Sequence, residues 1–153
     1  MVEMPLGIRK LELYGLHKSV GVLILALTMA RLGWRLSGTR PVALGPSRAW
    51  ERVLAHSVHV GFYLVLIAMP LSGWLLSSAA NFSVSVFGMF TLPDLVAPDK
   101  ALQETLAAVH GWLAWGLAGL LVLHVAGALK HHFVLKNATL RRMIPGRSKA
   151  PQQ

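Results

Sequence analysis

One apolar run, residues 106–129, constrains this chain more than any other stretch. Its sequence is LAAVHGWLAWGLAGLLVLHVAGAL, and its ionisable side chains are His110 and His124 alone. A run of this length crosses the hydrocarbon core of a bilayer as a helix. At about 1.5 Å rise and about 3.6 residues per turn, the two histidines lie about 21 Å apart on nearly one face. The run therefore predicts a membrane helix with two imidazoles pointing the same way at two depths.

Composition supports an integral membrane protein. Apolar residues make up 54% of the chain and charged residues only 14%, which is too apolar for a soluble domain of this size. The net charge of +9 comes from basic residues that flank apolar runs. The positive-inside rule explains such flanks, and no nucleic-acid motif is present, so we expect lipid and no nucleic acid as partner. The chain has no cysteine, which excludes disulfides, zinc–thiolate sites, thiol catalysis and covalently attached haem.

Two further apolar runs, about 15–36 and 53–77, predict membrane helices. We expect a single all-α membrane domain, 1–153, built as a helical bundle with three transmembrane helices. Residues 1–14 are expected to be a short interfacial lead-in, and the Gly- and Pro-rich residues 37–52 a turn-rich connection. Pro70 should kink the second helix. Residues 78–100 contain several helix breakers and are expected to lie along the membrane surface.

The distribution of charge predicts the topology. Basic residues dominate the 37–52 connection and the 130–153 tail, whereas acidic residues dominate 77–105. By the positive-inside rule the connection and the basic C-terminal tail face the cytoplasm, and the 78–105 loop faces outward. Three spans with a cytoplasmic C-terminus leave the N-terminus outside without a signal sequence. We therefore expect that a preceding transmembrane helix is missing from this chain.

Five histidines lie in or at the mouth of the apolar runs, where ionisable side chains are costly and are functional candidates. In the predicted topology His17 and His110 are both near the outer face. Neutral imidazoles are good ligands for haem iron, so these two can meet across one haem as axial ligands. His124 lies nearer the cytoplasm and needs its own partner. Candidates are His56, His59 and a histidine on the missing helix.

Two alternatives to a haem protein remain at this point. A histidine-lined metal or proton transporter is disfavoured because no Asp or Glu lies inside any predicted span to neutralise a moving cation. A truncated membrane fragment that binds one haem or none is the other alternative. The adjacent pair His131 and His132 cannot share one helical face, so we interpret it as a solvated or headgroup-contacting pair.

The chain resembles the bacterial cytochrome b561 family, grouped with the cytochrome b subunits of nickel hydrogenases. The resemblance covers nearly the whole chain in order and spacing. It rests on LHKSVGVLILALTMARLGWRL, LAHSVHVGFYLVLIAMPLSGWLLSSA, VSVFGMF and VHGWLAWGLAGLLVLHVAGALKHHFVLKNATLRRMIP. It implies a four-helix membrane bundle with two b-type haems, each held by two histidines. The implied function is electron transfer between quinone and a second partner, such as superoxide or a dehydrogenase.

The resemblance also assigns residues. His17 and His110 match one pair of haem ligands, and His124 matches a ligand whose family partner is on the first helix. This chain shows no such helix, so the resemblance predicts one haem b and leaves the second open. His56 and His59 match positions that are not ligands in the family pattern, although either can substitute here. The resemblance places Arg31 and Arg35 where haem propionates or a quinone headgroup can be held.

Overall fold

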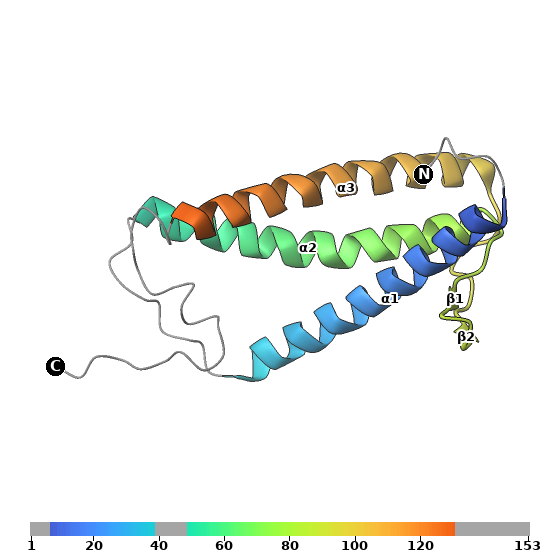
Figure 1. The fold of residues 1–153 in the computed structure, drawn as a ribbon, viewed down its shortest axis with the longest axis horizontal. Coiled ribbons are helices and arrows are strands. Elements are labelled where there is room, and N and C mark those ends of the chain that lie inside the picture. Colours follow the sequence, from blue (N-terminus) through green and yellow to red (C-terminus); the bar gives the residue numbers. More distant parts are fainter. Residues whose placement is uncertain (1–6, 39–48, 131–153) are drawn as a thin grey trace.

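The computed structural model describes residues 7–38 and 49–130 and consists mainly of three helices. These are α1 (Ile8–Ser37), α2 (Ala49–Ala79) and α3 (Lys100–Leu129), and α2 runs opposite to the other two (Figure 1). Each is long and apolar enough to cross a bilayer. The expected fold class, a helical membrane bundle with three spanning helices, is confirmed.

All three helices extend beyond the apolar runs from which they were predicted. Helix α1 begins at Ile8, so the expected lead-in is helical from that residue onward. Helix α3 begins six residues before its apolar run, because the Asp99 side chain accepts a hydrogen bond from the Leu102 N–H at 2.9 Å and caps the helix. Helix α2 continues through Pro70. The expectation of a turn-rich connection over 37–52 was wrong at its ends, because Ser37 belongs to α1 and residues 49–52 to α2. Residues 39–48 and the basic tail beyond Lys130 lie outside the described residues.

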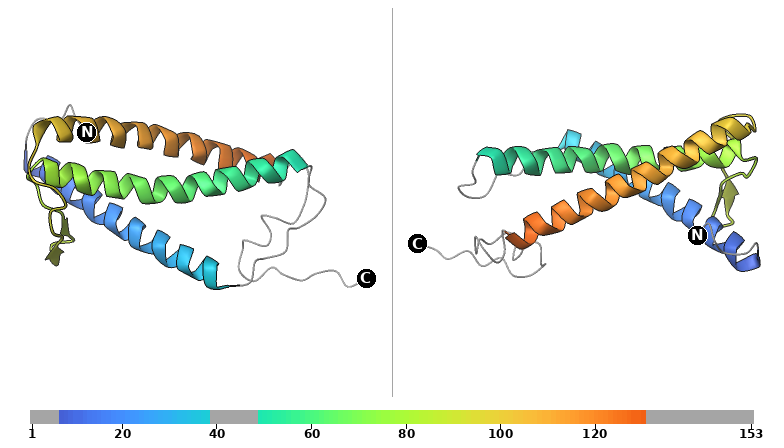
Figure 2. Two further views of the ribbon diagram at one scale, coloured as in Figure 1. Left: turned by 180° about the vertical axis from the view of Figure 1, so that it is seen from behind. Right: turned by 90° about the horizontal axis from the view of Figure 1, so that it is seen from above.

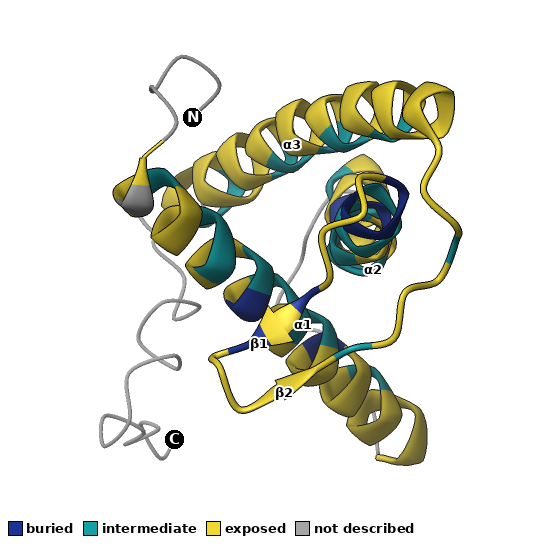
Figure 3. Cartoon of the chain, turned by 90° about the vertical axis from the view of Figure 1, so that its right-hand side faces the viewer, coloured by how far each residue is buried: buried dark blue, intermediate teal, exposed yellow. Residues whose placement is uncertain are grey.

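Helix α2 lies between the other two helices. Among the described residues, α1 and α3 each pack against α2 but their backbones do not contact one another. Helix α1 approaches α2 at the end where α1 begins and diverges from it toward Ser37 (Figure 1), and Figure 2 shows the same divergence from behind. Figure 3 shows α2 nearly end-on, in the angle between α3 and α1. The backbones of α1 and α3 are therefore held in place mainly through α2.

A small hairpin follows α2. Strands β1 (Ser85–Val86) and β2 (Phe90–Thr91) pair antiparallel. Phe87 and Gly88 at the turn both have positive φ, 49° and 72°, as in the primed turns that suit the twist of a hairpin. The interruption of the helical pattern in this segment was predicted from its turn residues, but the hairpin was not. Its turn is fixed to α1, because Ser19 Oγ accepts a hydrogen bond from the Phe87 N–H at 2.9 Å.

The side chain of Lys18 fastens the start of α1 to the end of α2. Its Nζ donates to Ser77 Oγ at 3.0 Å and to the carbonyl oxygens of Phe82 and Ser83, each at 3.1 Å. The same ammonium lies 4.0 Å from the centroid of the Phe82 ring. Hydrogen bonds from a charged donor are among the stronger ones in proteins. This network fixes the position of His17, the preceding residue in the chain.

Candidate functional site

The imidazoles of His17 on α1 and His110 on α3 face one another across the gap between these helices. Their ring centroids are 6.0 Å apart and their planes are 80° apart. A cavity of about 490 Å³ adjoins both rings. The structure thus brings together the two histidines that the sequence predicted at one depth, on helices whose backbones do not touch.

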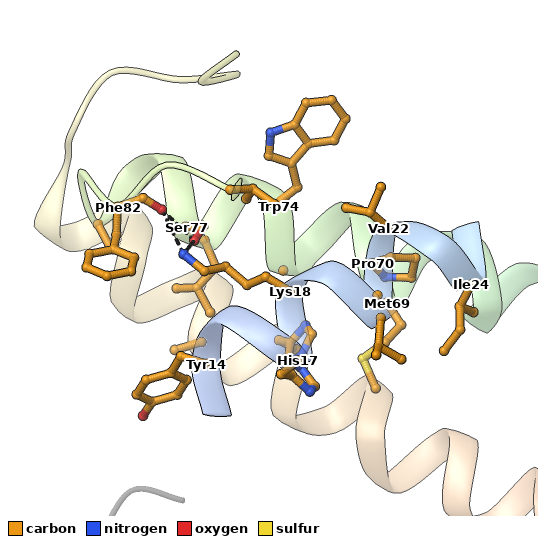
Figure 4. Close-up of a pocket in the computed structure, with 18 of the residues that line it drawn as sticks. Tyr14, His17, Lys18, Val22, Ile24, Met69, Pro70, Trp74, Ser77 and Phe82 are labelled. Carbon is orange, nitrogen blue, oxygen red and sulfur yellow. Dashed lines mark hydrogen bonds between the residues drawn. The ribbon is translucent and has the colours of Figure 1, made fainter. Parts of the chain in front are cut away.

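The wall of this first cavity is largely apolar. Met69 and Pro70 from α2 and Val22 and Ile24 from α1 line it, and Lys18 reaches past it to Ser77 and Phe82 (Figure 4). Such a cavity, with few polar groups placed among apolar side chains, is typical of a cofactor site. Gly21 of α1 and Gly73 of α2 also line it, and their missing side chains leave room beside the backbone.

The spacing of the two rings fits a haem iron held by two axial imidazoles. A first-row metal binds imidazole nitrogen at about 2 Å, and the ring centroid lies about 1 Å behind that nitrogen, so two trans imidazoles have centroids about 6 Å apart. The observed 6.0 Å agrees with this value. Among the described residues no group of three or more His, Asp or Glu side chains is placed to hold a metal ion. Two imidazoles alone suit a metal whose other ligands come from a macrocycle.

Two residues of α2, Ser72 and Gly73, lie against the His110 ring. Ser72 Oγ lies 3.0 Å from Nδ1 of His110 and donates its proton to the Met69 carbonyl oxygen at 2.7 Å. The next residue, Gly73, faces the same ring, because a Cβ added there would lie 3.1 Å from Cε1 of His110. Ser72 is buried. The His110 ring therefore contacts the Ser72 hydroxyl and occupies the space left by the missing side chain of Gly73.

A second histidine pair lies toward the other end of the bundle. The rings of His59 on α2 and His124 on α3 have centroids 5.7 Å apart and planes 59° apart. Phe62, one turn from His59, meets His124 edge-on with a centroid distance of 5.4 Å. A second cavity, of about 440 Å³, is lined by all three of these residues. By the spacing argument given above, this pair also fits a bis-imidazole iron site.

The second cavity is positively charged. Arg31 and Arg35 from α1 line it, and no Asp or Glu is among its lining residues. The Arg35 guanidinium lies 5.6 Å from the centroid of the Tyr63 ring, which orients it. Guanidinium groups are suited to bind carboxylates through two parallel hydrogen bonds. The cavity thus combines two imidazoles with a binding site for anionic groups.

The two cavities lie end to end along the bundle. Ile24 and Leu66 line both of them. On α3 the two histidines are 14 residues apart, and on the antiparallel α2 the residues that face them, Gly73 and His59, are also 14 residues apart. At about 1.5 Å per residue, the sites are about 21 Å apart along the helix axis.

The structure distinguishes residues that the sequence left equivalent. Of the two candidate partners for His124, His59 contacts it, whereas His56 lines neither cavity. The sequence analysis gave Ser72 and Gly73 no role at the site. The available signal was a polar residue next to a glycine within an apolar run, at the same depth as His110. Phe62 and Tyr63 were also assigned no role. His131 and His132 lie outside the described residues.

Comparison with known proteins identifies the family. The family model described as "Prokaryotic cytochrome b561" matches residues 2–146. The chain belongs to the prokaryotic cytochrome b561 family. It is similar to cytochrome b561 homolog 2 of Escherichia coli (strain K12), with 40% identity over 129 residues, 84% of this chain and 69% of the relative. It is also similar to a probable superoxide oxidase, CybB, of Yersinia pestis, with 35% identity over 130 residues, 85% of this chain and 73% of the relative.

Membership in the cytochrome b561 family, together with three spanning helices, defines the broad function. The chain is a multi-pass bacterial membrane protein that transfers electrons through b-type haem. Imidazole side chains, such as those of the two histidine pairs, have the chemistry to hold such a group.

Proposed function

We propose that His17 and His110 are the two axial ligands of a b-type haem lying between α1 and α3, and that the chain passes electrons between quinone and a second redox partner. The observation that carries this proposal is the pair of imidazoles facing one another at 6.0 Å beside an apolar cavity. Haem bound in this way supplies a one-electron ferric/ferrous couple. The protein residues provide ligation, spacing and electrostatics.

The residues around the first cavity have separable tasks. His17 and His110 would hold the haem iron with two imidazoles, which would leave no position for oxygen and disfavours oxygenase or peroxidase chemistry. Met69, Pro70 and the aliphatic side chains of α1 give the site an apolar lining. Lys18 holds the start of α1 against the end of α2 and so fixes the distance of His17 from His110.

The second cavity is proposed to hold a second b-type haem through His59 and His124. The support is their 5.7 Å spacing together with Arg31 and Arg35 in the same cavity, since these guanidinium groups suit the two propionates of a haem. The family pattern instead supplies the partner of His124 from another helix. With both sites filled, the chain would hold two haems at different depths of the membrane, between which electrons could pass.

Quinone is the proposed mobile partner because it carries electrons within the bilayer, which each of the three described helices is long and apolar enough to cross. The similarity to a probable superoxide oxidase makes superoxide a candidate electron donor for this chain as well. We expect the basic C-terminal tail, 130–153, on the cytoplasmic side of the inner membrane, by the positive-inside rule. In this orientation the His17–His110 site is nearer the outer face.

A quinol titration tests the proposed partner. Anaerobic addition of a short-chain quinol to the oxidised, detergent-solubilised protein is expected to reduce the haem, and one quinol carries enough electrons for two sites. The visible absorbance change, scaled to that produced by dithionite, measures the extent of reduction. The His110→Ala variant serves as the control: with one haem fewer, it should show about half of the wild-type absorbance change per mole of protein before scaling. Full reduction by dithionite with none by quinol would contradict the assignment of quinone.

A further inference from the structure

We propose that Ser72 and Gly73 of α2 act as positioning residues for His110, setting the tautomer and orientation of its ring and thereby the reduction potential of the haem it binds. These two residues are called the His110 cradle below. The inference rests on the proposed role of His110 as an axial ligand. It assigns a task to a helix that supplies neither ligand of the first site.

The hydrogen bonds available to Ser72 favour one tautomer of His110. A serine hydroxyl has one proton to donate and two lone pairs that accept. The Ser72 hydroxyl is placed to donate to the Met69 carbonyl oxygen at 2.7 Å, and in that arrangement its 3.0 Å contact with His110 has the proton on Nδ1. Neutral imidazole then carries its free lone pair on Nε2. That nitrogen is the one available for a metal, and second-shell partners of ligating histidines act in this way.

The buried position of the hydroxyl strengthens this argument. Ser72 is 6% exposed, on a helix that otherwise presents mainly apolar side chains to the first cavity. A buried serine in a membrane helix can satisfy itself by bonding to its own backbone, as Ser72 does with Met69. The second contact, to His110 on α3, is a polar contact between two helices. It restricts the orientation of the His110 ring more than apolar packing alone would.

Gly73 supplies the shape of the cradle. A Cβ at this position would lie 3.1 Å from Cε1 of His110, closer than an ordinary contact, and 3.4 Å from its Nδ1. Any larger residue would therefore push the imidazole away from Ser72. Gly61, on the same helix, is equally crowded, with 3.1 Å to Cδ2 of Leu120. Its neighbour is the end of a flexible side chain and no candidate ligand, so Gly61 is a matched control.

The hydrogen bond from Nδ1 also affects the haem. An acceptor on Nδ1–H increases the basicity of the imidazole and favours the ferric state, so it lowers the reduction potential. Removing the acceptor should raise the potential of the haem bound by His110. Removing second-shell partners of ligating histidines typically weakens metal binding about 10- to 100-fold. A haem held by His59 and His124 should not respond, because it lies about 21 Å away along the helix axis.

The test is a spectroelectrochemical titration of purified Ser72→Ala, Ser72→Thr and Gly73→Ala variants, with haem retention measured in parallel. Ser72→Ala and Gly73→Ala should each shift one redox component to a more positive potential and weaken haem retention about 10- to 100-fold. That component is the one that His110→Ala eliminates. Ser72→Thr keeps the hydroxyl and should restore the wild-type potential.

Two controls separate positioning from general packing. Ser78→Ala removes another buried serine hydroxyl from α2, and Gly61→Ala adds a methyl group at an equally crowded glycine; both should leave the potential unchanged. An unchanged potential in Ser72→Ala, or equal shifts in Ser72→Ala and Ser72→Thr, would overturn the cradle. If His110→Ala keeps its full haem content, the ligand assignment itself fails, and this outcome is distinct from failure of the cradle alone.

Discussion

His110→Ala and His17→Ala variants are expected to lose the haem of the first cavity, so that each retains one haem fewer per chain than the wild-type protein. Each substitution removes one of the two nitrogen ligands that face one another at 6.0 Å. Alanine offers no metal ligand, and the largely apolar lining contains no other histidine to replace it. The haem-to-protein ratio of detergent-purified protein, from the pyridine haemochrome spectrum, measures this loss.

His131→Ala is the control for these variants. The residue lies beyond the apolar run of α3, and we expect its replacement to leave the haem content unchanged. Retention of full haem content in both the His17 and the His110 variants would refute the pairing.

His124→Ala and His59→Ala are expected to remove the haem of the second cavity and to leave the first haem in place. The two rings are 5.7 Å apart, and each would lose its trans partner. In a potentiometric titration of the wild-type protein we expect two components, and in each of these variants only one. The remaining component should be the one that responds to Ser72→Ala.

His56→Ala is a closely matched control for His59→Ala. Both residues are histidines on α2, three positions apart, but His56 lines neither cavity. The His56 variant should therefore keep both haems. Two haems in His59→Ala, with His124→Ala losing one, would show that His124 takes its partner from elsewhere.

The transporter alternative receives no support from the second cavity. Its lining includes Arg31 and Arg35 and no acidic side chain, so a cation entering it meets like charge. The described residues also contain no cluster of three potential metal ligands. A positively charged cavity with two imidazoles suits an anionic cofactor better than a moving cation.

The sequence was sufficient for the helices and for the depth of the histidines. Long apolar runs report membrane helices because lipid solvates no backbone polar group, and a fixed rise per residue converts spacing into depth. The pairing of His17 with His110 followed from depth and topology. The ends of the helices were not predicted from the apolar runs, because α1 and α3 continue into polar sequence. The start of α3 is set by a local polar contact, the cap formed by Asp99.

Depth alone did not choose the partner of His124. His56 and His59 lie one turn apart, so both reach the same level of the membrane, and only the rotation of α2 about its axis decides which one faces α3. That rotation depends on the close packing of α2 against α1 and α3. The contact of Ser72 with His110 could not be predicted either, because it also depends on the rotation of α2 about its axis.

The visible spectrum of the dithionite-reduced wild-type protein, recorded before and after addition of carbon monoxide and combined with the haem-to-protein ratio, tests the bis-imidazole sites most directly. With both axial positions of each iron filled by histidine, carbon monoxide has no open position to bind. We predict two b-type haems per chain and a spectrum that carbon monoxide leaves unchanged. A colourless protein, or a spectrum that carbon monoxide shifts, would contradict the proposed ligation.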